Sequence, residues 1–172
     1  TFLSAGPYFV TVTNGIGITE VEMSFFIAAP PILSYEGVSN SGNVAKFMSM
    51  TPLIDIQGAP VTNCSITPAL PDGLSINSSN CVISGTPTVT DSKTYTVTVT
   101  NGAGDSTAPV SLNITPSPPK ISFSGFSGLG FLAIPFSATP SELDNNGALI
   151  TNCRSNPALP SGLSIHPNTC VI

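Results

Sequence analysis

Residues 95–100 have the sequence Tyr-Thr-Val-Thr-Val-Thr, in which apolar and hydroxyl side chains alternate. Successive side chains of a β-strand point to opposite faces, so the alternation predicts a strand that buries Tyr95, Val97 and Val99 and exposes the threonines. Asn101-Gly102 follows directly, and such a pair favours the positive φ angles of a tight hairpin turn. The segment therefore predicts the first arm of a β-hairpin with one buried face.

The alternation resumes after this turn, where Val110, Leu112 and Ile114 lie two residues apart. Upstream, short segments rich in β-branched residues are separated by Gly, Pro and Asn at intervals of about 8–12 residues, which is typical of a β-sandwich. No stretch has a sustained helical period. We therefore predict an all-β fold with almost no helix.

The chain also contains an internal repeat. Thr-Asn-Cys at 62–64 recurs at 151–153, and Cys-Val-Ile at 81–83 recurs at 170–172, each 89 residues later. Thr-Val-Thr-Asn-Gly at 11–15 recurs 87 residues later. A period of about 88 residues predicts an array of similar domains.

The phase of this repeat predicts three parts. Residues 1–31 match the closing strands of one repeat, residues 32–119 form a complete repeat, and residues 120–172 match the opening strands of the next. Pro30-Pro31 and Pro118-Pro119 mark the junctions. Two consecutive prolines favour an extended chain, so we expect short, stiff linkers and a rod-like arrangement.

The sequence Pro-Ala-Leu-Pro-Asp-Gly-Leu-Ser-Ile at 68–76 recurs with one change at 157–165. Together with Val-Ile-Ser-Gly-Thr-Pro at 82–87 and the strand at 95–100, it resembles the Putative Ig repeat family of bacterial surface proteins. The resemblance covers about residues 53–114. The resemblance implies tandem immunoglobulin-like β-sandwich repeats. The paired cysteines resemble those of a disulfide-bearing subset of that family. Such repeats occur in adhesins, in large surface proteins and beside secreted enzymes.

The four cysteines form two pairs, Cys64 with Cys81 and Cys153 with Cys170, each separated by 17 residues. We predict one disulfide per repeat, each stabilising its domain by about 3 kcal/mol in the chain-entropy model. Such bonds indicate an oxidising compartment and an extracellular or cell-surface location. A zinc site is the alternative, but the chain has one histidine and no cysteines two residues apart.

The sequence offers no credible catalytic site or cofactor site. His166 is the only histidine, and it aligns with Asn77 in a predicted turn. Asp55 and Asp144 occupy matching positions, and the Asp-Asn-Asn-Gly sequence at 144–147 resembles part of a calcium loop. The bidentate glutamate of such a loop is missing, so we favour a turn and keep calcium as the weaker alternative.

Composition limits the partners of the chain. Only 8% of its residues are charged, with four basic residues against nine acidic ones, so we expect no nucleic-acid partner. The longest apolar stretch is residues 123–138, which contains Gly and Pro and is shorter than the roughly 20 residues of a membrane span. We therefore expect no membrane span in this segment.

The unmatched ends suggest a function. The apolar face of the first hairpin, with Tyr8, Val10 and Val12, is what the half-repeat ending at Val171 and Ile172 lacks. We expect a structural or adhesive surface protein, completed by strand addition from copies of itself head to tail. The alternative is that the segment is a window of a longer chain, completed by neighbouring repeats.

A carbohydrate-binding or spacer module of a secreted enzyme is the alternative function. Phe123, Phe126, Phe131 and Phe136 would then form an exposed platform for a host surface or glycan, although core packing explains them more simply.

Overall fold

The computed structural model describes residues 3–124, 131 and 134–172. The described residues form β-strands, turns and irregular segments and contain no helix, which confirms the predicted all-β class. In chain order the strands are β1 Leu3–Thr13, β2 Ile18–Ile27, β3 Ile32–Ser34, β4 Ser41–Asn43, β5 Met48–Met50, β6 Leu53–Asp55, β7 Val61–Thr67, β8 Leu74–Ile76, β9 Ile83–Gly85, β10 Thr94–Asn101, β11 Gly104–Ser111, β12 Asn113–Thr115, β13 Lys120–Ser122 and β14 Glu142–Asp144. Within this part of the chain, no helix has the length and apolar character needed to span a membrane.

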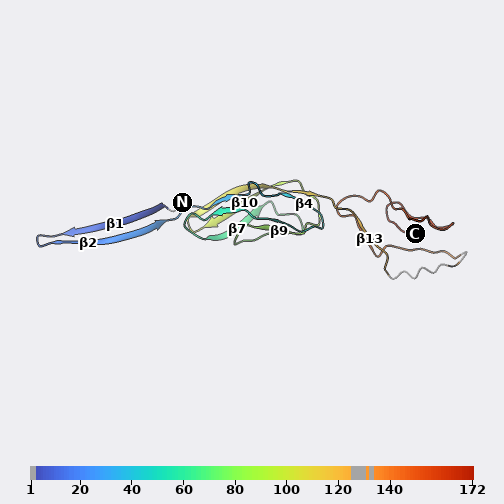
Figure 1. Cartoon of the computed structure of the whole chain (residues 1–172), viewed down its shortest axis with the longest axis horizontal. Helices are drawn as coiled ribbons and strands as arrows, with labels where there is room; N and C mark the ends of the chain where they lie inside the picture. Colours follow the sequence, from blue (N-terminus) through green and yellow to red (C-terminus); the bar gives the residue numbers. More distant parts are fainter. Residues whose placement is uncertain (1–2, 125–130, 132–133) are drawn as a thin grey trace.

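The molecule is elongated and has three parts in a row (Figure 1). Hairpin β1–β2 extends from one end, strands β3 to β12 form the central unit, and the segment with β13 and β14 follows at the other end. The hairpin and the C-terminal segment therefore lie on opposite sides of the central unit.

The central unit is a sandwich of short sheets, most of them antiparallel. One layer has the order β11-β10-β7, and another has the order β5-β9-β8. Strand β3 pairs antiparallel with β6, whereas β12 pairs in parallel with β4, so that Asn113, Ile114 and Thr115 lie beside Ser41, Gly42 and Asn43. The last strand of the unit thus returns to a strand near its beginning.

The core lies between these layers and contains the predicted hairpin face. Tyr95, Val97 and Val99 of β10 are at most 1% exposed. Val110 of β11 and Ile114 of β12 are also buried, as the alternation predicted. Full burial of one such side chain contributes about 1.5–3 kcal/mol, so this face supplies much of the stability of the unit.

A disulfide and two glycines hold the remaining strands close together. Cys64 of β7 is bonded to Cys81, just before β9, with 5.2 Å between the Cα atoms. Gly73 and Gly85 pack backbone against backbone, since a Cβ on Gly73 would lie 2.0 Å from the carbonyl oxygen of Thr86. Both glycines have positive φ angles. The Asp-Gly-Leu and Ser-Gly-Thr sequences of the repeat are thus explained by a contact that excludes any side chain.

The C-terminal segment repeats the opening half of the central unit. Strands β13 and β14 pair antiparallel, as β3 and β6 do. Cys153 and Cys170 form the second disulfide, also with 5.2 Å between Cα atoms. Cys170 has a φ of 54°, close to the 55° of Cys81. Residues 150–156, which match β7, form no strand, because no β10 counterpart pairs with them among the described residues.

We predict that the central unit loses stability between about pH 10 and about pH 12. Burial raises the pKa of Tyr35 to about 12, and burial followed by a hydrogen bond to Asp91 raises the pKa of Tyr95 to about 12. The same hydroxyls ionise near pH 10 in the unfolded chain. The unfolded state therefore binds fewer protons in this range, and the free energy of unfolding falls as pH rises.

Urea denaturation at a series of pH values measures this loss. The double variant Tyr35→Phe, Tyr95→Phe should be less stable at neutral pH but should show a weaker decline above pH 10. An equal decline in the variant and the original chain would contradict the assignment.

Candidate functional site

Hairpin β1–β2 has a defined register and turn. Tyr8 lies opposite Met23, and Val10 lies opposite Val21. At the turn, Asn14 Oδ1 accepts hydrogen bonds from the backbone N–H groups of Ile16 and Gly17 at 2.8 and 3.0 Å. The sequence pattern that predicted β10–β11 therefore produces a second hairpin of the same kind.

The apolar face of this hairpin is exposed. Its seven alternating side chains are 45–66% exposed, whereas the matching side chains of β10, β11 and β12 are 0–5% exposed. The exposed set is Tyr8, Val10, Val12, Val21, Met23, Phe25 and Ile27; the buried set is Tyr95, Val97, Val99, Ala108, Val110, Leu112 and Ile114. The rings of Tyr8 and Phe25 stack with centroids 4.9 Å apart. The face is thus ordered as in the central unit but is not covered by any described residue.

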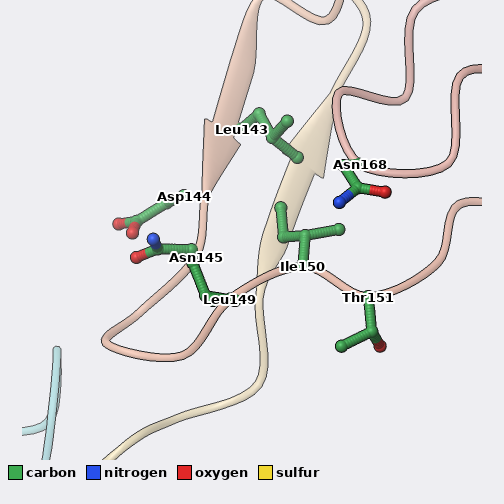
Figure 2. Close-up of a pocket in the computed structure, with 7 residues that line it drawn as sticks. All are labelled: Leu143, Asp144, Asn145, Leu149, Ile150, Thr151 and Asn168. Carbon is green, nitrogen blue, oxygen red and sulfur yellow. The ribbon is translucent and has the colours of Figure 1, made fainter.

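The C-terminal segment contains a groove. This groove is lined by Leu143, Leu149, Ile150 and Asn168, with Leu143 and Ile150 contributed by β14 and by the segment that matches β7 (Figure 2). Ile150 corresponds to Val61, which pairs with Asn101 of β10 in the central unit. The groove therefore lies beside the residues that match β7, and β7 pairs with β10 of the closing hairpin in the central unit.

Val171 and Ile172, which were predicted as an assembly end, lie in the C-terminal segment. Ile172 exchanges two backbone hydrogen bonds with Ala138, at 2.8 and 2.9 Å, as Ile83 pairs with Met50. Val171 is half-buried in the same segment. Residues 150–156 match β7, and the predicted assembly ends did not include them. The recurrence of Thr-Asn-Cys at 62–64 and 151–153 is the signal that identifies these residues.

Asp55 and Asp144, the calcium candidates, both stabilise turns. Asp55 Oδ1 accepts the N–H of Gln57 at 3.0 Å, and Asp144 Oδ1 accepts the N–H of Asn146 at 2.8 Å. The bond from Gln57 lowers the pKa of Asp55. No group of three or more His, Cys, Asp or Glu side chains able to hold a metal ion occurs in the described ranges.

His166 also has a turn role. Its Nδ1 accepts the N–H groups of Asn168 and Thr169 at 3.3 and 3.2 Å. Asn77 Oδ1, at the matching position, accepts the N–H of Ser79 at 2.8 Å. Nδ1 of His166 thus accepts turn hydrogen bonds at the position where Asn77 Oδ1 does so in the central unit.

The aromatic platform is described only in part. Phe131 is 68% exposed and Phe123 is 39% exposed. Phe136 is half-buried, and Phe126 lies outside the described residues.

One buried amide joins the closing hairpin to the interdomain linker. Asn101 is 4% exposed, and its Nδ2 donates to the carbonyls of Ala29 and Ile56 at 2.8 and 3.0 Å. Its Oδ1 accepts the N–H groups of Ala103 and Gly104 at 2.9 and 3.2 Å. One side chain therefore connects the hairpin turn, the β6–β7 loop and the linker, which sequence periodicity could not reveal.

Two packed antiparallel layers joined by a disulfide define an immunoglobulin-like module. Comparison with family models agrees: residues 26–115, more than half of the chain, match the family described as Putative Ig domain. The chain belongs to this family. An Ig-like module with disulfides fits a structural or adhesion-type role in an extracellular or secreted protein.

Solved structures show similarities of fold alone. Domains A168–A170 from titin match with a TM-score of 0.45 and 16% identity, covering 94% of this chain and 61% of that one. The N-terminal four Ig domains of Dscam1 isoform 1.9 match with a TM-score of 0.40 and 21% identity, covering 60% and 26%. A "putative alpha-galactosidase" from Bacteroides fragilis matches with a TM-score of 0.43 and 21% identity, covering 56% and 20%. The chain thus spans less than two thirds of each of these structures, and no curated protein matches it.

We predict that Asn101→Ala lowers the free energy of unfolding of the central unit by about 2 kcal/mol, because it removes the hydrogen bonds that this buried amide makes to Ala29, Ile56, Ala103 and Gly104. Urea unfolding followed by tyrosine circular dichroism measures the loss. Asn40→Ala, at an exposed position, is the control and should change stability by less than about 0.5 kcal/mol. Equal stabilities for the two variants would contradict the role of Asn101.

Proposed function

We propose that this chain is part of a cell-surface rod or fibre assembled head to tail. Hairpin β1–β2 of one copy completes the half-repeat at 120–172 of a second copy. The observation that carries the proposal is the exposed apolar face of the hairpin, whose counterpart in the central unit is buried. The central unit thus serves as the template for the contact between copies.

The β10–β7 register predicts how this contact would be aligned. Val99 pairs with Cys64 and Thr98 with Ser65. Applied to the repeat positions, the same register pairs Val12 of one copy with Cys153 of the other, and Thr11 with Arg154. The hairpin would add a strand to residues 150–156, a recognised mode of β-augmentation.

The positions of the two halves favour an open assembly. Within one copy, the hairpin and the half-repeat lie on opposite sides of the central unit (Figure 1). One copy therefore does not complete itself. A contact between different surfaces of successive copies is heterologous, and it extends indefinitely unless its rotation closes a ring.

Charge supports this pairing. Glu20 lies opposite Thr11 on the outer face of the hairpin. In the transferred register, Arg154 would lie on the other side of Thr11, on the same face, about 10 Å from Glu20 between Cβ atoms. Both side chains are long enough to approach each other across the threonine. In the central unit the matching residues, Thr107 and Ser65, are uncharged.

The expected affinity is moderate. The seven apolar side chains are already about half buried, so complete burial contributes on the order of 1 kcal/mol each. Association costs roughly 4–15 kcal/mol, which is comparable with the total gained by burying these seven side chains. Backbone pairing must supply the rest, and assembly should depend on protein concentration.

We predict that the chain forms open oligomers as its concentration rises, and that Val10→Asp prevents this by burying a charge in the joint. Analytical ultracentrifugation and electron microscopy measure the assembly. Thr13→Asp, on the outer face of the same strand, is the matched control and should still assemble. A chain that stays monomeric at all concentrations, or a Val10→Asp variant that assembles like the control, would refute the proposal.

A charge exchange tests the register. Glu20→Lys should weaken assembly several-fold, since it places two positive charges near each other, and adding Arg154→Glu should restore it. The effect should shrink at high salt, because both groups are exposed. Independent, additive effects of the two changes would exclude the proposed pairing of these strands.

In protein from its natural source, mass under denaturing, non-reducing conditions separates assembly from continuity. A discrete species with the mass of one copy supports joined subunits. A far larger single species would overturn assembly from separate copies and place the hairpin contact within one long chain.

A further inference from the structure

We infer that Asn14 sets the register of the joint between copies, by donating its side-chain amide to the carbonyls of Ser117 and Asn145 in the second copy. This inference rests on the proposed head-to-tail assembly and names the residue that aligns it.

The side-chain oxygen of Asn14 accepts the same kind of hydrogen bonds from its own turn as that of Asn101 does. In the central unit, Asn101 Oδ1 accepts two N–H groups of its own turn, at 2.9 and 3.2 Å, while Nδ2 points to the linker and the β6–β7 loop. In the exposed hairpin, Asn14 Oδ1 accepts the N–H groups of Ile16 and Gly17 at 2.8 and 3.0 Å. The bonds made by the oxygen leave the amide nitrogen directed away from the turn.

The acceptor side is arranged alike at the two junctions. The N–H of Ala29 donates to the carbonyl of Gln57 at 2.9 Å, and the N–H of Ser117 donates to that of Asn146 at 3.1 Å. Linker and loop are thus held together in the same way in the complete unit and in the half-repeat.

The loop itself also repeats. The carbonyl of Ile56 accepts the N–H of Ala59 at 3.1 Å, and the carbonyl of Asn145 accepts the N–H of Ala148 at 3.1 Å. The carbonyls of Ser117 and Asn145 therefore lie as those of Ala29 and Ile56 do, and the latter two receive Asn101 Nδ2.

A polar group at this position selects one alignment. Hydrophobic side chains at alternate positions would tolerate a slip of two residues, because the slip keeps the apolar face inward. Such a slip would move the Asn14 amide away from both carbonyls and bury it without a partner, which is unfavourable. The apolar face therefore supplies attraction, and Asn14 supplies the register.

Asn14→Asp tests this inference, because a carboxylate keeps the acceptor for Ile16 and Gly17 but removes the donor. We expect assembly to weaken at least tenfold, equivalent to about 1.4 kcal/mol, in ultracentrifugation of the full chain. The amide NMR signals of Ile16 and Gly17 in the unassembled chain should stay close to those of the original, which shows that the turn is intact. In the assembled original chain, the Asn14 side-chain amide should be protected from hydrogen exchange.

The outcomes separate this inference from the proposed assembly. If Asn14→Asp assembles as tightly as the original while Val10→Asp does not assemble, the role of Asn14 is wrong and the assembly stands. If the original chain does not assemble, both are wrong. If Asn14→Asp disrupts the turn signals, Asn14→Ser decides, since its hydroxyl can cap the turn but cannot reach the carbonyls; unchanged assembly of that variant overturns the inference.

Discussion

The pairing of a closing hairpin with the opening strands is the interaction on which the rest of this structure depends. Strand β10 is hydrogen-bonded to β7 on one side and β11 on the other, and its inward side chains form the centre of the core. The disulfide from Cys64 then connects β7 to the segment before β9. The chain shows this pairing complete in the middle, with its two components separate at the ends.

Much of the local geometry of the half-repeat exists without that pairing. The second disulfide, the Ala138–Ile172 hydrogen bonds and the turns at Asp144 and His166 match those of the central unit. These features depend on residues near one another in the half-repeat. The counterparts of β5, β7 and β8, at 136–138, 150–156 and 163–165, are not among the described strands, and a strand needs a neighbour. An arrangement already ordered in this way would lower the entropy lost in the proposed binding of a hairpin.

Residue patterns in the sequence predicted what depends on short-range order. The alternation at 95–100 identified the buried side chains, and the equal cysteine spacing identified the two disulfides that the structure contains. The same alternation at Tyr8, Val10 and Val12 identified an apolar face but not what covers it. Asn101 was predicted only as a turn residue, because its partner Ala29 is 72 residues away and no local pattern encodes that contact.

The parallel pairing of β4 with β12 has a mechanical consequence. These strands belong to the beginning and the end of the central unit, and they are joined by backbone bonds that include Asn113 N–H to the carbonyl of Asn40 and Val44 N–H to that of Thr115. A pull on the two linkers draws the strands past each other along their length, so the bonds are loaded in shear and resist together. Peeling would instead break them one at a time. Tension along the long axis of the unit (Figure 1) would therefore load the β4–β12 bonds together.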